Sequence, residues 1–387
     1  MGTGADRPRR YHSSVMSPGR HEQDQEAGDN SEQQQAARDI INITQVGVSA
    51  ADVIAITRSE TKRVIEEELT PAAERIAHER LDQFEQKMID RFAEDPQLRK
   101  AFADPDFQYS LRDASRAAAS NDDDHTEDLL VDLLANRAAE GNSARLRLIT
   151  SRAIQAADKL SIEALRGLTA TWAVTVLGPS EPSALGYVTA CTGIAAVVLR
   201  LGTETDHGWI EDLEALGLAR TPSGIAVSRK PYKQLLGDRA AAHLNRGIDQ
   251  ETHRDLIESA VAECPWLGQL LVPHQLKPGV LALAGTTADE FRNLVPADSR
   301  QSPEIEQLIA LNGFGVQDAA AVAKFNELFD QAEPLVEIAA WWDLLPIFDL
   351  TLIGRAIGLV NARRHITFRG VQTIAEMLAK PQPPATP

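Results

Sequence analysis

The sequence has few aromatic residues, few cysteines and fewer basic than acidic residues. Aromatic residues make up 5% of the 387 residues, whereas hydrophobic residues as a whole make up 43%. Strands of β-sandwiches favour aromatic and β-branched side chains, so this composition favours closely packed helices instead. The formal net charge is −17. An acidic protein repels nucleic acid and anionic lipid, so either partner would require a local basic patch.

The two cysteines, Cys191 and Cys264, have no CxxC spacing and no neighbouring histidine. We expect both to be free, buried and apolar in character, which fits a reducing compartment. The first residues contain no apolar segment of the signal-peptide kind. These features predict a cytoplasmic protein.

Sequence motifs that carry chemistry are also lacking. The sequence contains no HExxH, GxSxG or Walker A motif and no glycine-rich turn between a strand and a helix. The acidic run "NDDDH" at 121–125 lacks the alternating ligands of a calcium loop, so we expect a solvated turn. We therefore predict no catalytic, cofactor or metal site. An enzyme whose site is assembled from distant residues stays an alternative.

One apolar stretch, Trp172–Leu199, raises the question of a membrane span, because Glu181 is its single charged residue. The run "GPSEPS" at 178–183 divides it into two pieces that are short for a span. The sequence favours two buried core helices, and membrane contact is the alternative.

We expect an all-α fold: a multi-helix bundle with a long coiled-coil-like N-terminal helix, one short N-terminal β-strand and a small β-wing. Residues 1–38 are polar and contain too few large apolar side chains to offset the entropy of ordering. The expected divisions are a disordered tail at 1–38, a β-strand leader at 39–48, an N-terminal helical region at 49–160, a central helical domain with the wing at 161–265, a C-terminal helical region at 266–380 and a Pro-rich tail at 381–387.

Several local patterns locate the helices. Ser49 and Thr126 are placed to cap helices that follow them. Residues 72–95 are amphipathic, with apolar residues three and four apart. That face consists of Ile76, Ala77, Leu81, Phe84, Met88 and Phe92.

Three segments combine turn residues with short apolar runs. Residues 221–227 resemble the wing of a winged helix, and a plain surface hairpin is the alternative. Residues 264–287 contain several prolines and glycines, which predict a bend or a joint between domains. "LIALNGFGVQDAAAVAKF" at 308–325 is similar to a helix-hairpin-helix motif. It is acidic, so we favour a plain corner between two helices over DNA binding.

A local basic patch lies near the C-terminus, with no acidic residue between Asp349 and Glu376. The patch predicts a contact with phosphate, RNA, DNA or lipid, and the alternative is pairing with the protein's own acids. The patch consists of Arg355, Arg363, Arg364 and Arg369.

The segment Asp39–Ser49 is β-prone, unlike the helical sequence after it. As a strand it would present Ile41 and Ile43 on one face and Ile40 and Val46 on the other. A lone strand is marginal in water, so an apolar strand of this kind needs a partner. We predict that it joins copies of the chain in a homo-oligomer, and a tail that packs on the bundle is the alternative.

This segment also carries a resemblance. "QQQAARDIINITQVGVSAADVIAI" resembles a leader found ahead of several bacterial defence effectors, with Ala37 where that leader usually has glycine. "DPDFQYSLRDASRAA", "DLLVDLLANRA" and "LTLIGRAIGLVNARR" are similar to the body of an uncharacterised bacterial family with the same leader. That likeness covers most of residues 28–160 and a patch at 349–364.

A looser likeness links "DLLVDLLANRAAEG", "LSIEALRGLTATWA" and "WIEDLEALGLA" to the abortive-infection alpha proteins. The two resemblances imply a cytoplasmic, non-enzymatic protein of anti-phage defence that self-assembles through its leader strand and responds to a phage or host protein. The alternative function is a nucleic-acid-binding regulator that uses the wing and the C-terminal basic patch. Neither resemblance supplies catalytic residues.

Overall fold

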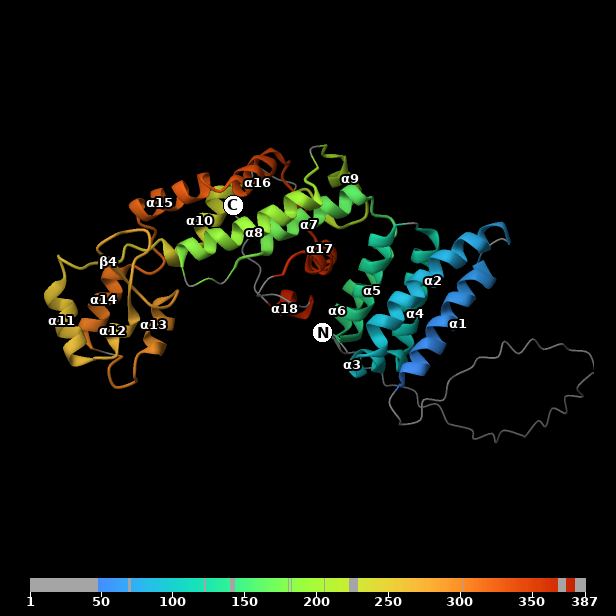
Figure 1. Ribbon diagram of the computed structural model, residues 1–387, viewed down its shortest axis with the longest axis horizontal. Coiled ribbons are helices and arrows are strands. Elements are labelled where there is room, and N and C mark those ends of the chain that lie inside the picture. Colours follow the sequence, from blue (N-terminus) through green and yellow to red (C-terminus); the bar gives the residue numbers. More distant parts are fainter. Residues whose placement is uncertain are drawn as a thin grey trace, which may run out of the picture. The chain divides into compact units, whose positions relative to one another are not determined.

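The chain is mostly helical, which confirms the predicted all-α class. The computed structural model contains eighteen α-helices and five strands of two to four residues in the part of the chain that it describes (Figure 1). These residues belong to one unit of the chain, Gln45–Pro387. The structure describes residues 48–68, 71–121, 123–139, 143–179, 181, 183–204, 206–222, 229–300, 302–367 and 374–379.

The N-terminal region is a bundle in which the longest helix, α2, contacts α1, α3, α4 and α5. The predicted apolar face of α2 is confirmed except at Ile76, which is 47% exposed. Ser49 caps α1 as predicted: its Oγ accepts from the Asp52 N–H, and the Asp52 carboxylate accepts from the Ser49 N–H. The elements are α1 (Ala50–Glu68), α2 (Pro71–Ala93), α3 (Pro96–Arg99), the 3-10 helix η1 (Lys100–Ala103), α4 (Pro105–Ser120), α5 (Asp124–Ala139) and α6 (Ala144–Ala157).

The apolar stretch after residue 160 forms two helices, α7 and α8, separated at 177–183 as predicted. Within the described residues, α8 is the one helix long and apolar enough to cross a membrane, and a third of it is buried. Cys191 on α8 and Cys264 are both free and buried, as predicted. The elements are α7 (Ile162–Val176), α8 (Ala184–Leu201), α9 (Gly208–Ala215), β1 (Ala219–Arg220), α10 (Tyr232–Arg239) and the 3-10 helix η2 (Ala241–His243).

Residues 248–314 have a separate small core that includes Cys264, Phe291 and Leu308. The joint predicted at 264–287 is instead α12 and an antiparallel hairpin of β3 and β4, with β2 on the other side of β4. Of its prolines and glycines, Pro278 and Gly279 lie in the turn between β3 and β4, and Gly285 follows β4. The expected boundary between 265 and 266 lies within this core. The elements are β2 (Ile248–Asp249), α11 (Arg254–Glu263), α12 (Leu267–Leu270), β3 (Leu271–Pro273), β4 (Val280–Leu283), α13 (Ala288–Leu294) and α14 (Pro303–Asn312).

The final helices return to the earlier parts of the chain. Helix α17 contacts α5, α6 and α7, and β5 pairs with β1. The elements are α15 (Ala319–Asp330), α16 (Glu333–Leu344), β5 (Asp349–Leu350), α17 (Leu352–His365) and α18 (Ile374–Ala379).

Two glycines allow α17 to approach its neighbours closely. A Cβ on Gly358 would lie 2.6 Å from the Cβ of Trp172, and one on Gly354 would lie 2.1 Å from the carbonyl oxygen of Leu218. Since real Cβ atoms do not come this close to other heavy atoms, glycine is needed at both positions.

Several predicted features lie outside the described residues: the disordered tail at 1–38, most of the leader strand with Ile40, Ile41, Ile43 and Val46, most of the wing predicted at 221–227, Arg369 and the Pro-rich tail. The coiled-coil-like character of residues 72–95 also stays a prediction.

Candidate functional site: an ionic junction on α5

Helix α5 begins with a cap that differs from the prediction. The carboxylate of Asp123 accepts hydrogen bonds from the backbone N–H groups of His125 and Thr126. Asp123 is therefore the capping residue, and the predicted cap, Thr126, is buried in the first turn. Aspartate is at least as good a cap as threonine, and the earlier start places Asp124 in the helix rather than in a solvated turn.

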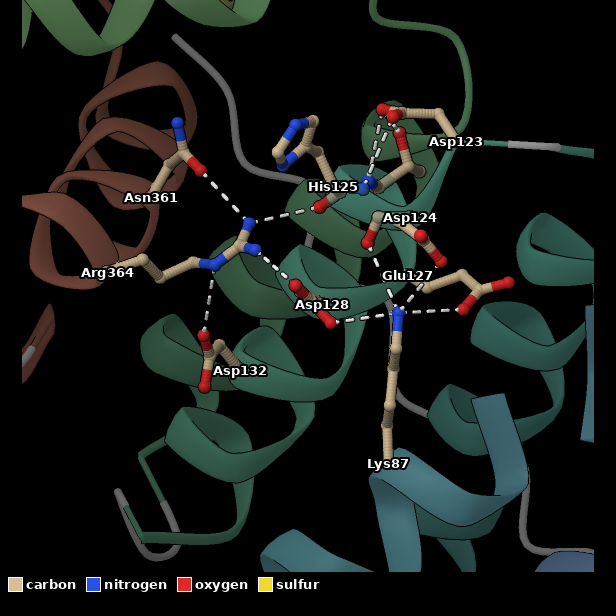
Figure 2. A network of polar contacts seen from close by, with 10 residues as sticks. Lys87, Asp123, Asp124, His125, Glu127, Asp128, Asp132, Asn361 and Arg364 are labelled. Atoms are coloured by element: carbon tan, nitrogen blue, oxygen red, sulfur yellow. Dashed lines mark hydrogen bonds and ion pairs between the residues drawn. The ribbon is translucent and has the colours of Figure 1, made fainter. Parts of the chain in front are cut away.

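This start sets the register of an acidic stripe along α5. Asp124, Asp128 and Asp132 are four residues apart, so they lie on one side of the helix, and Glu127 is adjacent to them. The stripe faces basic side chains from α2 and α17 (Figure 2). We call this set the junction; it consists of Lys87, Asp124, Glu127, Asp128, Asp132, Asn361 and Arg364.

On one side of the junction, Lys87 of α2 contacts three carboxylates. Its Nζ lies 2.9 Å from Glu127, 3.0 Å from Asp128 and 3.4 Å from Asp124. Because an ammonium group has three N–H donors, it can satisfy these acceptors together.

On the other side, Arg364 of α17 forms an ion pair with Asp128 through Nη2. Its Nε lies 3.8 Å from Asp132, and its Nη1 donates to the backbone carbonyl of His125 at 3.0 Å and to Asn361 at 3.3 Å. The two oxygens of Asp128 thus hold different cations, Lys87 and Arg364, and this one carboxylate connects α2 to α17 (Figure 2).

Asn361 extends the junction to a fourth helix. Its side-chain amide donates to the hydroxyl of Thr169 on α7 at 2.8 Å, and both residues are buried. Hydrogen bonds between buried side chains are geometrically demanding, so this contact fixes the register of α17 against α7.

Burial and charge act together on the titratable groups here. Glu127 is 2% exposed, and its burial raises the pKa against the opposing effect of Lys87. Burial also raises the pKa of Asp132, with Arg364 and Arg91 acting in the opposite direction. Burial lowers the pKa of Lys87, but its bonds to Glu127 and Asp128 outweigh this and leave the pKa raised. Lys87 therefore stays charged, and the junction is an electrostatic contact between helices.

The residues predicted to bind phosphate or nucleic acid have different environments. Arg364 belongs to the junction and is 15% exposed. Arg363 is exposed, and Arg355 is half-buried near Asp349, where burial lowers its pKa. Nine residues along a helix of 3.6 residues per turn amount to about two and a half turns, so Arg355 and Arg364 lie on opposite sides of α17. The predicted phosphate or nucleic-acid role of these arginines stays a prediction.

The corner at 308–325 consists of α14, a turn with Gly313 and Gly315 in the left-handed region, and α15. The Asp318 carboxylate accepts from the N–H groups of Ala320 and Ala321 at the start of α15. This acidic cap occupies the amides that would hold a phosphate in a helix-hairpin-helix motif.

Sequence reasoning missed the junction, although a signal was present. Carboxylates at 124, 128 and 132 form a charged side on a helix that is otherwise rich in leucine. Such a stripe predicts a basic partner, but nothing in the spacing identifies Lys87 or Arg364. Within the described ranges, no group of three or more histidine, cysteine or acidic residues is placed to hold a metal ion.

The fold and the junction thus define a mostly helical protein in which helices distant in sequence are held together by shared ion pairs. The chain belongs to an uncharacterised protein family, whose model matches residues 47–371. No curated protein and no solved structure matches the chain. The matched range includes only the last two residues of the leader strand predicted at 39–48. The resemblance of that leader to those of defence effectors therefore stays a prediction.

Proposed function

We propose that this protein acts in bacterial defence against phage, in the manner of abortive infection, and that it acts by association in the cytoplasm rather than by catalysis. The observation that carries the proposal is the junction. Its acids, of which Glu127 is buried, are paired with cations of the same chain, as expected for a group that holds helices together. Catalytic acids are instead placed to face a substrate.

The sequence resemblances support the same proposal. The leader at 33–56 is similar to those of defence effectors, and a looser likeness connects residues 128–219 to the abortive-infection alpha proteins. In this proposal the leader strand joins copies of the chain through main-chain pairing, and the helical body senses a phage or host protein.

The ion pairs of the junction give the helical body a means of responding to a binding partner. A partner with its own charged surface could compete for Asp128 and separate α17 from α5, because an ion pair that is partly exposed is sensitive to competing charge. Breaking the pair takes from Arg364, which is 15% exposed, the carboxylate that connects α17 to α5, so the two arrangements would be discrete.

A phage challenge tests the proposal. Cells that carry the gene, the empty vector or an Asp128→Asn variant are infected with a panel of phages, and plaques and surviving infected cells are counted. We expect fewer plaques and lower survival of infected cells with the intact gene. Equal plaque numbers with gene and vector across the panel would contradict the defence role.

The nucleic-acid alternative has less support from the described residues. Arg364 is engaged by Asp128, and the corner at 308–325 carries an acidic cap. Arg363 is the residue of the basic patch that is exposed on α17, and it provides the variant that separates the two functions.

A further inference from the structure

Helix α8 has one packed face and one outward face. Its packed residues, such as Cys191 and Val198, are buried, and the helix contacts α7, α15 and α16 (Figure 1). The outward positions are exposed or half-buried and almost entirely uncharged. These positions are Leu185, Gly186, Thr189, Ala190, Gly193, Ala196, Val197 and Arg200.

Gly193, at the middle of this face, has no close neighbour among the described residues. Glycine is among the least favourable residues in a helix interior, so it usually marks a close approach. In the long helices α7 and α17, Gly167 and Gly358 follow this rule, since a Cβ on either would overlap a tryptophan at 2.5 Å and 2.6 Å. Gly237 and Gly268, in the short helices α10 and α12, meet nothing nearer than 4.0 Å. Gly193 lies in a helix of 18 residues, and a Cβ on it would meet nothing within 4 Å. The described residues of the chain therefore supply no close neighbour for this glycine.

The charges at the two ends of the face indicate which neighbour fits. Arg200 is at the C-terminal end, and Glu181 precedes the N-terminal end. Neither side chain forms an ion pair with another residue in the described ranges. Gly193 lies close to the midpoint of α8. An antiparallel copy of α8 that crosses at Gly193 would place each Arg200 beside the first turn of the other helix, within reach of its Glu181.

We propose that α8 pairs with α8 of a second copy of this chain, in an antiparallel arrangement that crosses at Gly193. A twofold axis there makes the interface self-complementary, as in most homodimers. Small residues at the crossing let the two backbones approach closely, and two Arg200–Glu181 pairs determine the orientation. This surface is separate from the leader strand, so the inference does not depend on the proposed function.

A lipid bilayer is the competing occupant, because α8 is apolar and roughly 27 Å long at 1.5 Å per residue. A spanning helix is surrounded by lipid or other spanning helices, whereas α8 is packed along one side on α7 and α16. Insertion would have to break that packing, whereas pairing with a second copy retains it.

Cross-linking of the full-length chain tests the geometry. Residues near a twofold axis approach their own copies, so we expect Gly193→Cys to form an intermolecular disulfide under mild oxidation. Leu185→Cys is the matched control on the same face, and its copies would lie at opposite ends of the helix pair. Cross-linking of Leu185→Cys but not of Gly193→Cys would exclude the antiparallel arrangement.

Sedimentation of the full-length chain tests the energetics. We expect a concentration-dependent dimer whose dissociation constant rises at least about tenfold in Gly193→Leu. Arg200→Glu should weaken the dimer, and adding Glu181→Arg should restore it. Leu148→Glu, at a 61% exposed position on α6, should have no effect. If Gly193→Leu and Arg200→Glu dimerise like the unaltered chain, the proposal is wrong.

Two further experiments distinguish pairing through α8 from association through the leader strand and from binding of lipid. If deletion of residues 36–46 abolishes self-association and the α8 variants do not affect it, the leader is the interface and the α8 pairing is excluded. If the intact chain remains monomeric and binds phosphatidylcholine vesicles, and Ala196→Glu abolishes that binding, α8 contacts lipid and the pairing is again excluded.

Discussion

The Cβ of Trp172 lies 2.6 Å from the position that a Cβ on Gly358 would occupy. This approach brings α7 and α17 together where Asn361 bonds to Thr169 one turn further along α17. Gly358 on α17 and Trp172 on α7 thus set the spacing of the two helices at the hydrogen bond between Asn361 and Thr169, which links the junction to α7.

We predict that Gly358→Ala lowers the free energy of unfolding by about 1–3 kcal/mol, since the added methyl group overlaps Trp172 and adjustment in a packed core is costly. Urea denaturation provides the measurement. Gly193→Ala is the matched control, because it makes the same change in another helix where nothing lies within 4 Å. In dilute protein it should leave stability unchanged or slightly higher. Equal losses in both variants would argue against the close contact.

Asp128→Asn should destabilise the fold more than an equivalent change at the surface. The substitution removes the anion shared by Lys87 and Arg364. Losing one partner of a fully buried pair costs about 3–5 kcal/mol, and because Asp128 is 39% exposed we expect about 1–3 kcal/mol.

The control is Asp289→Asn, whose carboxylate pairs with Arg292 and is 89% exposed. Exposed pairs contribute at most about 1 kcal/mol. Thermal unfolding of the two variants compares them directly. A loss at Asp128 no larger than that at Asp289 would show that the junction does not hold the helices.

The stability should also depend on pH through His365, next to Arg364. Burial lowers the pKa of His365, and the charges of Arg364 and His125 act in the same direction. The folded protein therefore binds this proton less strongly than the unfolded chain. The stability contributed by neutral His365 is complete above the unfolded pKa of about 6.5 and is lost as the pH falls through the lowered folded value.

His365→Gln removes this titration. We expect the free energy of unfolding of the unaltered chain to fall relative to the variant between about pH 7 and pH 5. Parallel stability profiles of the two proteins over this range would contradict the prediction.

The variant Arg363→Glu distinguishes defence by association from the alternative function, nucleic-acid binding. Because Arg363 is exposed on α17, the association account predicts that the variant still protects cells from phage. The nucleic-acid alternative predicts retention on DNA or RNA at low salt that falls in the variant. Loss of both retention and protection would favour that alternative, so plaque counts and filter binding should be measured on the same variant.

The sequence predicted local structure better than long-range contacts. Ser49 and the break at 177–183 were predictable because caps and turns depend on neighbouring residues. The face of α2 was predictable from its period except at Ile76, since the period alone does not indicate which positions a neighbouring helix covers. The pairing of β1 with β5 and the sheet at 248–283 were missed, because their strands have two to four residues and depend on partners distant in sequence.

The junction illustrates the same limit. Asp124, Asp128 and Asp132 are regularly spaced in the sequence, whereas the cations that pair with them come from α2 and α17. Charge alone suggested a basic patch around Arg364. Its contact with Asp128 follows from the packing of α17 against α5, which the sequence alone does not indicate.

The most direct test of the account is the survival of infected cells that express the intact chain or the chain without residues 36–46. The account predicts that the intact chain lowers both plaque number and the survival of infected cells. It also predicts that the deletion abolishes both effects and removes the part of self-association that depends on the leader strand, while the pairing through α8 remains. Full protection by a deleted chain that has lost this leader-dependent association would contradict the claim that this protein defends cells by association.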